Sequence, residues 1–449
     1  MTKNSILRPL SLLIAVILTF TLVACGGGNS SSSSSQGSSS GTTQTPSASS
    51  GTATPDAGAE PVKVAVFIAL SGTDASSAVF QIQALDLVVA EINAKGGVEG
   101  LDGAPIELVY FDNMSDTTQM KTVVEAALQD DDITFALFPA SSAYTFAAIA
   151  AITKSQTPSL TTSRSDSIFQ QGCDYIYTVG QLSSLGAGLA MDYCQWLAKE
   201  YDLDTTKIGI ISVDNEYGVT NARGYRDNIA KIDGFEIVYD SLYPVAISDM
   251  SSIVTALKTN GVEILFQTGL DQDSKLLFNT ISMMNFNPVV IGGGSGLLYP
   301  SYANALGDDV IGLISSSMGC SNFKAAVEDP TYSALMNKCY DLYGHEGGDY
   351  MLCYDAMFKI IVDTLNETGT RDREINNKAL KNMEYEVLYP MLDKEGNPTN
   401  IMYFDEFGTS PNSILTMVQY RKTNHGNVPV VIYPKAFATA ELQFGTGVK

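Results

Sequence analysis

Short apolar runs alternate with amphipathic segments from Val62 to residue 292. The apolar runs have the length and composition of buried strands, and the segments between them have the spacing of helices that bury one face. We expect strands at 62–70, 105–111, 133–138, 157–162, 207–213, 235–241, 262–268 and 288–292. We expect helices at 78–94, 117–129, 142–154, 184–200, 218–231, 249–259 and 272–284. This order predicts an α/β protein whose parallel sheets are covered by helices on both faces.

The alternation starts afresh after Gly180, and the roughly 390 residues after the N-terminal segment exceed what one core supports, so two lobes are expected. The sequence then favours helices at 323–343, 349–367 and 373–383, followed by strand-like sequence. We expect those helices to return to the first lobe and the last strands to the second. The predicted lobes are therefore 61–180 with about 316–402, and 181–315 with about 403–449. Two such lobes would hinge about a cleft at the carboxyl ends of their sheets.

The first 25 residues indicate export. Lys3 and Arg8 form a basic leader, residues 10–22 are apolar but short for a membrane span, and the sequence LVAC ends at Cys25. This pattern resembles a bacterial lipoprotein signal peptide. It implies cleavage of residues 1–24, lipidation of Cys25 and a place in the cell envelope, anchored to the outer face of the cytoplasmic membrane or periplasmic. An uncleaved transmembrane anchor is the alternative.

Residues 26–60 consist almost entirely of Gly, Ser, Thr, Ala, Pro and Gln, so residues 25–60 are expected to form a lipidated, disordered linker. The formal net charge of the chain is −23, and it becomes −25 when the leader and its two basic residues are removed. A chain this acidic repels nucleic acid and anionic lipid, so no nucleic-acid partner is expected.

Residues 133–166 carry the strongest indication of a binding site. Pro139 ends a buried strand, and Ser141 and Ser142 lie where the N-cap of the next helix is expected. The free N–H groups and the dipole of such a helix favour an anion. The following strand then brings residues 163–165 to the same edge, so we expect a small ligand with a carboxylate there. An ordinary helix cap beside a polar loop is the simpler alternative.

Few groups suit catalysis or metal binding. Residues 292–296 are rich in glycine but lack the Lys-Ser/Thr ending of a phosphate loop. The two histidines, His345 and His425, lie in loop-like sequence far from the expected cleft. His345 lies close to Glu346 and Asp349, which suggests a metal site, but surface residues in a turn are the simpler interpretation. We therefore expect no enzyme, no cofactor and no metal.

Five cysteines remain beyond Cys25, so at least one thiol is unpaired. An exported location permits disulfides, and Cys339 with Cys353 would join two adjacent helices. Free thiols fit the spacing equally well, so the pairing is left open for Cys173, Cys194, Cys320, Cys339 and Cys353.

Several motifs occur in an order and spacing that resemble type I periplasmic binding proteins, specifically the branched-chain amino-acid (Leu/Ile/Val) substrate-binding lipoproteins of ABC importers. They are LSG (70–72), EINAKGGVEG (91–100), IELVYFDNMSD (106–116), FPASS (138–142), TPSLTTS (157–163), DNEYG (214–218) and IGGG (291–294). The resemblance covers roughly residues 62–320, and 320–449 more loosely. It implies two Rossmann-like lobes joined by a three-crossing hinge.

In that family, first-lobe hydroxyl and backbone N–H groups hold the ligand's α-carboxylate, and a second-lobe tyrosine reaches it when the cleft closes. By this resemblance, Ser142 corresponds to the serine at the start of the third helix, with Ser141 beside it. Ser163 and Ser165 correspond to the small residues after the fourth strand. Tyr217 corresponds to the closing tyrosine, although it could also be a partly buried aromatic at a helix start.

Other positions depart from the family pattern. Ser77 stands where the family often has an aromatic wall, and Leu270 replaces a second-lobe tyrosine. The acidic residue that meets the ligand's ammonium falls near Gly294, so Asp271 is the nearest candidate for that role; otherwise the ligand lacks an ammonium. Arg164, between the two contact serines, could pair with a second carboxylate, or it could turn to solvent.

Together these features predict a solute-binding lipoprotein that closes over a small carboxylate-bearing ligand, such as an amino acid or a related small acid or amide, and delivers it to an ABC permease. A sensory or regulatory lipoprotein of the same fold is the main alternative. A cell-surface hydrolase is a weaker one.

Overall fold

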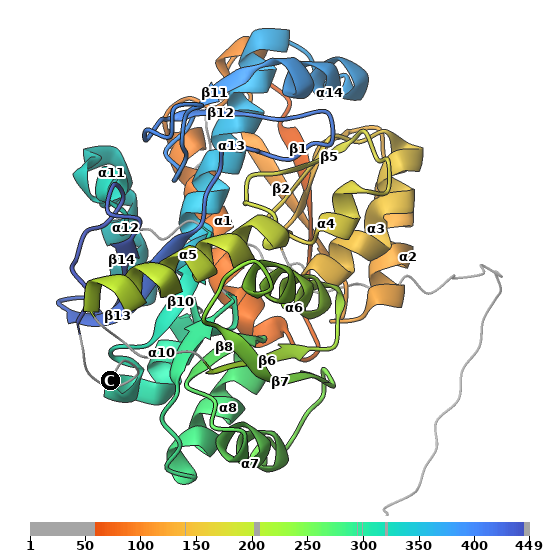
Figure 1. Cartoon of the computed structure of the whole chain (residues 1–449). Coiled ribbons are helices and arrows are strands. Elements are labelled where there is room, and N and C mark those ends of the chain that lie inside the picture. Colours follow the sequence, from red (N-terminus) through yellow and green to blue (C-terminus); the bar gives the residue numbers. More distant parts are fainter. Residues whose placement is uncertain are drawn as a thin grey trace, which may run out of the picture. The chain divides into compact units, whose positions relative to one another are not determined.

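The computed structural model describes residues 59–139, 141–201, 207–293, 295–298, 300–318 and 322–443 (Figure 1). The expected signal peptide, the lipidation site Cys25, the linker, Gly294 and Cys320 lie outside the described residues.

The first sheet has five parallel strands in the order β2-β1-β3-β4-β5. They are β1 (Val62–Ile68), β2 (Ile106–Asp112), β3 (Ile133–Phe138), β4 (Ser159–Thr161) and β5 (Ile176–Thr178). Parallel neighbours need crossover connections, which helices supply here. These are α1 (Ala75–Ala94), the short η1 (Glu99–Leu101), α2 (Thr117–Ala127), α3 (Ser142–Ser155) and α4 (Asp166–Phe169).

Helices cover both faces of this sheet. Val64 and Val66 of β1 point into a core shared with α1 and α13 (Gly348–Thr368), whereas Phe67 points into a core shared with α2 and α3. Successive side chains of a strand face opposite ways, so a doubly covered strand needs a continuous apolar run. All three side chains are fully buried, and each burial stabilises the fold by about 1.5–3 kcal/mol.

The second sheet has seven strands in the order β14-β13-β10-β9-β8-β6-β7. They are β6 (Lys207–Val213), β7 (Glu236–Tyr243), β8 (Ile264–Thr268), β9 (Val289–Gly292), β10 (Ile314–Ser317), β13 (Thr416–Thr423) and β14 (Gly426–Tyr433). Strands β6 to β10 pair in parallel, whereas β13 and β14 are antiparallel additions at one edge. The helices between β5 and β10 are α5 (Ser183–Tyr201), α6 (Glu216–Ile229), α7 (Ser251–Thr259), α8 (Asp271–Met283), α9 (Ser295–Leu298), α10 (Pro300–Leu306) and the short η2 (Gly307–Val310).

The second sheet is also covered on both faces. Ile208 and Ile210 join a core with α5 and α6, and Ile211 and Val213 join a core with α7 and α8. The predicted fold class, two α/β lobes with parallel sheets between helices, is confirmed. Strands β5 and β10, of three and four residues, were not predicted.

The C-terminal part contributes to both lobes. It contains α11 (Lys324–Glu328), α12 (Pro330–Tyr343), α13, α14 (Arg373–Asn382), β11 (Glu384–Glu386) and β12 (Ile401–Tyr403). The single helix predicted over 323–343 is wrong. Pro330 has no N–H and starts a new helix, and the carboxylate of Asp329 caps it by accepting a hydrogen bond from the Tyr332 N–H at 2.7 Å.

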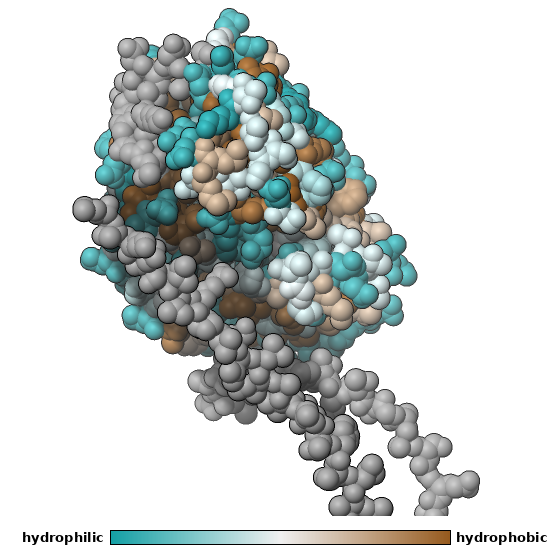
Figure 2. All heavy atoms as spheres, turned by 90° about the horizontal axis from the view of Figure 1, so that it is seen from below, coloured by the Kyte–Doolittle hydropathy of each residue, from teal (hydrophilic) through white to brown (hydrophobic). Residues whose placement is uncertain are grey.

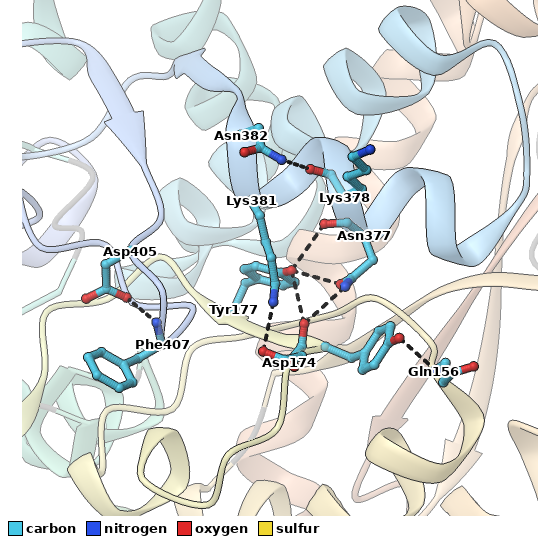
Figure 3. A network of polar contacts seen from close by, with 10 residues as sticks. Gln156, Asp174, Tyr177, Asn377, Lys378, Lys381, Asn382, Asp405 and Phe407 are labelled. Atoms are coloured by element: carbon cyan, nitrogen blue, oxygen red, sulfur yellow. Dashed lines mark hydrogen bonds and ion pairs between the residues drawn. The ribbon is translucent and has the colours of Figure 1, made fainter.

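Figure 3 shows how α14 is held against β5. The hydroxyl of Tyr177 donates to Asn377 Oδ1 at 2.8 Å, and Lys381 Nζ lies 2.8 Å from Asp174 Oδ1. These contacts join positions about 200 residues apart, so the C-terminal helices complete the first lobe's core. The exact domain boundaries stay a prediction.

Three segments pass between the two sheets: β5 to α5, β10 to α11 and β12 to β13. The first and third are tied together. Thr178 N donates to the Gly408 carbonyl at 2.9 Å, and Leu415 N donates to Gln181 Oε1 at 3.1 Å. Three crossings at one place are the arrangement of a hinge.

Polar and apolar residues are interleaved on the face that Figure 2 shows. Exposed large apolar side chains such as Met283 and Val245 are scattered singletons, which are ordinary on protein surfaces. Helix α1 is long and apolar enough to resemble a membrane-spanning helix, but it packs within the first core.

Candidate functional site

Strands β3 and β4 end at the same edge of the first sheet, and polar residues follow each of them. Helix α3 begins after β3, and its N-cap Ser141 accepts a hydrogen bond from the Ala143 N–H at 3.3 Å. Residues 162–165 follow β4. This edge forms one wall of a cavity of about 70 Å³, and residues of the second lobe form the facing wall.

Eight of the ten predicted binding residues line this cavity. They are Ser77, Ser141, Ser142, Ser163, Arg164, Tyr217, Leu270 and Asp271. Gly294 lies outside the described residues, and Ser165 does not line the cavity. That the eight contact a ligand remains a prediction.

The first-lobe wall is built from hydroxyl groups. Thr145 and Ser163 share a hydrogen bond of 2.7 Å between their side-chain oxygens, and the Ser163 N–H donates to Thr161 Oγ1 at 2.9 Å. Ser142 is 4% exposed, and its hydroxyl makes no hydrogen bond to another described residue. A buried hydroxyl without a partner loses the hydrogen bonds it had to water, so this one is available to a ligand.

Arg164 is buried, at 3% exposure, so the alternative that it turns to solvent is wrong. Its Nε donates to the Gln181 carbonyl at 3.1 Å, at the first crossing. Its Nη1 is buried and has no hydrogen-bond partner in the described part of the chain. A guanidinium keeps its charge even when buried, so Arg164 places one positive charge in this wall.

Asp271 is less available to a ligand ammonium than the sequence suggested. It heads α8, and its carboxylate forms an ion pair with Lys275 at 2.8 Å and accepts a hydrogen bond from Ser301 Oγ at 3.0 Å. Its neighbour Leu270 donates its N–H to Asp273 at 2.7 Å. Burial raises the pKa of Asp273 to about 6. The second-lobe wall is thus held by its own internal contacts.

Tyr217 lies at the start of α6, which Asn215 caps by accepting the Gly218 N–H at 2.9 Å. Its ring lines the cavity and is 5% exposed, while its hydroxyl donates to the Gly293 carbonyl. A closing tyrosine would therefore have to share or exchange this hydrogen bond.

Ser165 connects the lobes instead of lining the cavity. Its hydroxyl lies 2.8 Å from Thr220 Oγ1 and 3.1 Å from Glu216 Oε1, both on α6, and Ser167 also donates to Glu216. We call Ser165, Ser167, Glu216 and Thr220 the interlobe latch. With these contacts in place, the two lobes touch beside the cavity.

Sequence reasoning missed several residues of the cavity wall: Asp74, Gln81, Tyr144, Thr162, Met318 and Tyr350. One signal was present at the start of α1, where its N-cap Asp74 and the helix residues Ser77 and Gln81 recur at helical spacing. Gln81 is 3% exposed, and its Oε1 accepts a hydrogen bond from the Tyr354 hydroxyl at 2.9 Å.

A second cavity, of about 180 Å³, lies among α10, α12 and β14. His345, Glu346 and His425 line it, but the described residues hold no group of three or more metal-ligating side chains. The interpretation of His345 as a surface residue is wrong. It is 8% exposed, its Nε2 contacts Gln83 Oε1 at 2.8 Å, and burial lowers its pKa to about 4.

The described cysteines are all free and buried, which rules out the disulfide between Cys339 and Cys353. Burial raises the pKa of both thiols to about 12, so neither is a reactive thiolate at neutral pH.

A sequence profile of the family described as periplasmic binding protein matches residues 61–413. The chain belongs to the periplasmic binding protein family. Its members are binding proteins and not enzymes, and the family name places them outside the cytoplasm. The resemblance inferred from the sequence motifs is confirmed.

The chain is similar to "Leu/Ile/Val-binding protein homolog 8" of Brucella abortus (strain 2308), with 28% identity over 258 residues. That alignment covers 56% of this chain and 62% of the relative. Among solved structures, the chain resembles the branched-chain amino acid transporter substrate binding protein LivJ from Streptococcus pneumoniae in complex with isoleucine. The TM-score is 0.66 and the identity 19%, over 83% of this chain and 100% of that one.

A solute binding protein of an ABC transporter from Rhodopseudomonas palustris BisB5, in complex with 3,4-dihydroxy benzoic acid, is similar to the same degree. Its TM-score is 0.66 and its identity 16%, over 83% of this chain and 96% of that chain. At these identities the likeness concerns the fold.

Proposed function

We propose that this protein is a solute-binding lipoprotein that closes its lobes over a small carboxylate-bearing ligand, an amino acid or a related small acid or amide, and delivers it to an ABC importer. The observation that carries the proposal is one cavity walled by Ser142 and Arg164 from the first lobe and by Tyr217 from the second. Convergent polar groups between two hinged lobes are typical of a ligand site.

The part of the first-lobe wall around Ser142 and Arg164 favours an anionic group, whereas the carboxylate of Asp74, elsewhere on that wall, accepts a hydrogen bond from the Tyr144 hydroxyl. It presents the unpartnered hydroxyl of Ser142, the buried cation Arg164 and the N-terminal end of α3. All three are donors or positive poles, and a carboxylate is acceptor-only. The two solved relatives described above hold isoleucine and 3,4-dihydroxy benzoic acid, and both of these ligands carry a carboxyl group.

Closure would be driven by contacts that only the joined lobes provide. In the open state the ligand touches the first lobe alone, whereas Tyr217 and Leu270 add contacts when the lobes meet. A ligand shifts such an equilibrium only by its difference in affinity for the two states. The interlobe latch adds protein contacts to the same closed state, so the ligand has to contribute less binding free energy to close the lobes.

The first test is a thermal-shift screen of the purified protein against amino acids, small carboxylic acids, amides, sugars and polyamines. We expect hits among carboxylate-bearing compounds, because ligand that binds only the folded state raises the unfolding temperature. Hits confined to sugars or polyamines would overturn the carboxylate assignment.

Delivery and anchoring need separate tests. Deleting the protein should abolish cellular uptake of the compound found in the screen; unchanged uptake would favour the sensory alternative.

Replacing Cys25 by Ser should move the protein from the membrane fraction to the medium or periplasm, because the acyl chains that hold it would be missing. Retention of the variant in membranes would contradict the lipid anchor.

A further inference from the structure

A carboxylic acid is buried at the hinge, behind the wall of the central cavity. Asp349 lies in the first turn of α13, is 3% exposed and does not line that cavity. Its carboxylate accepts hydrogen bonds from the Ser317 hydroxyl and, at 3.0 Å, from the Met318 N–H. Both donors lie where β10 ends and the second crossing begins. Asp349 therefore ties the first lobe to the second crossing.

The guanidinium of Arg164 approaches the same place from the first crossing, where its Nε donates to the Gln181 carbonyl at 3.1 Å. A Cβ at Gly180 would lie 3.4 Å from both Arg164 Cγ and Met318 Sδ, so these two side chains meet at this glycine. Arg164 and Met318 both line the central cavity. The two buried charges, Arg164 and Asp349, thus share Met318 as a neighbour and attract each other.

Opposing effects act on the charge of Asp349. Burial raises its pKa to about 6, whereas the hydrogen bonds from Ser317 and Met318 and the positive charge of Arg164 act to lower it. No direct ion pair joins Arg164 to Asp349 in the described structure, so the guanidinium can attract a second anion. A nearby negative charge disfavours an ionised carboxylate. An anion at the cavity wall beside Arg164 would therefore favour the protonated form of Asp349.

We propose that Asp349 is the resident counter-charge of Arg164, and that it takes up a proton from solvent when a carboxylate ligand binds at the first-lobe wall. The negative charge of the ligand then replaces that of Asp349 beside the guanidinium, so the buried cation is balanced with and without ligand. This inference rests on the proposed function, because it assumes a carboxylate in the central cavity. By linkage, the affinity for that carboxylate falls as the pH rises from about 5 to about 8.

Other titratable groups face Asp349 from the elements packed around it. They are Arg164, Cys353 and Tyr389 and, around the second cavity that Asp349 also lines, Tyr340, His345, Glu346, Tyr420 and His425. Burial raises the pKa of Cys353 to about 12 and lowers that of His345 to about 4, so neither changes its charge between about pH 5 and pH 8. His425 Nδ1 lies 2.7 Å from Glu346 Oε1, so a variant of His425 is needed as a control.

The first measurement needs no ligand. Carbon-13 NMR of the purified protein labelled at the aspartate carboxyl carbons follows the titration of Asp349, with Asp349→Asn assigning the signal. The midpoint should move up by at least half a pH unit in Arg164→Gln, because a cation that favours the ionised form is removed. Arg164→Lys keeps the charge and should restore most of the shift. A midpoint that does not move in Arg164→Gln would overturn the pairing of the two charges.

A milder variant guards against misfolding of Arg164→Gln. Ser317→Ala removes one hydrogen bond to the carboxylate and keeps both charges, so it should also move the Asp349 midpoint up. An unchanged midpoint in Ser317→Ala would show that this hydroxyl does not stabilise the ionised form.

The second measurement is isothermal titration at pH 5.5 and pH 7.5 with L-isoleucine and 3,4-dihydroxybenzoate, the compounds held by the two solved relatives. Affinity should be about three- to tenfold higher at the lower pH, and the measured heat should vary with the ionisation enthalpy of the buffer, as proton uptake requires. Asp349→Asn keeps the shape of the side chain and should bind equally at both pH values. A pH dependence that persists in Asp349→Asn would overturn the inference.

Matched controls are other titratable groups. Asp355 lies on the same helix, and burial also raises its pKa to about 6, but its nearest cations are Lys95 and Lys359. Asp355→Asn, Asp273→Asn and His425→Gln should each leave the pH dependence of binding unchanged. Loss of that dependence in any of the three, with Asp349→Asn still showing it, would assign the proton elsewhere.

The two levels of the account fail separately. If the Asp349 midpoint responds to Arg164→Gln but neither these compounds nor any carboxylate of the thermal-shift screen binds, the proposed function is overturned and the charge pair stands. If carboxylates bind with the same affinity at both pH values, only the proton linkage is overturned.

Discussion

The two walls of the cavity differ in what they leave unpaired. On the first-lobe wall, the hydroxyl of Ser142 makes no hydrogen bond to another described residue, and Arg164 Nη1 is buried without a hydrogen-bond partner in the described part of the chain. On the second-lobe wall, the hydroxyl of Tyr217 and the carboxylate of Asp271 already have protein partners. From this difference we propose that the first lobe recognises the ligand and that the second covers it.

The largest expected effect is on the free energy of unfolding, through Asp273, which accepts the Leu270 N–H in the second-lobe wall. Burial raises the pKa of Asp273 to about 6, against about 3.9 in an unfolded chain. The folded state therefore binds more protons between about pH 4 and pH 6, and the free energy of unfolding falls as the pH rises through that window. For this one group the total change is about 2–3 kcal/mol.

Replacing Asp273 by Asn should remove that contribution. Denaturant unfolding at pH 4 and pH 7 should show a smaller loss of stability with rising pH in the variant than in the natural protein. An unchanged difference between the two pH values would show that Asp273 does not titrate in this window.

The next effect tests the first wall. Ser142→Ala should weaken binding of the screened carboxylate by about 1–3 kcal/mol, because the ligand oxygen that this hydroxyl meets would be buried without a partner. Titration calorimetry measures the change, and Ser251→Ala, on the exposed start of α7, is the control. If Ser142→Ala leaves the affinity unchanged, the N-terminal end of α3 does not recognise the ligand.

Titration calorimetry of a variant in the second-lobe wall should show a smaller loss of affinity. Tyr217→Phe should cost about 0.5–1.5 kcal/mol of affinity, since the hydroxyl it removes already donates to the Gly293 carbonyl. A loss larger than that of Ser142→Ala would reverse the roles that we assign to the two walls.

The smallest effect concerns the interlobe latch. Glu216→Gln keeps the shape of the side chain but weakens its hydrogen bonds from Ser165 and Ser167, so the ligand-free protein should open more often. Small-angle scattering should then report a larger radius of gyration without ligand and an unchanged one at saturation. An identical ligand-free radius would show that the latch does not hold the lobes.

Local chemistry explains which parts of this molecule could be predicted from sequence. The strand at 133–138 and the cap at Ser141 follow from a short apolar run, a proline and a serine, and the structure has both where expected. Strand β10 reads Ile-Ser-Ser-Ser, a polar sequence that becomes a strand because β9 and β13 pair with it on either side. Pairing of that kind has no local signal.

The same limit applies to the site. Ser142 and Arg164 were found because they lie next to strand ends, whereas Asp74 joins the wall through its contact with Tyr144, 70 positions away. Ser165 was expected to contact the ligand, but residues of α6 more than 50 positions later take up its hydroxyl. For both Asp74 and Ser165, contacts between segments that are far apart in the sequence determine whether the residue lines the cavity.

A crystal structure of the protein with a bound carboxylate ligand tests the central claim most directly. We expect the carboxylate within hydrogen-bond distance of Ser142 Oγ and the guanidinium of Arg164, with the ring of Tyr217 opposite. A ligand that occupies the 180 Å³ cavity lined by His345 and His425, or that turns its carboxylate toward the second lobe, would contradict the account.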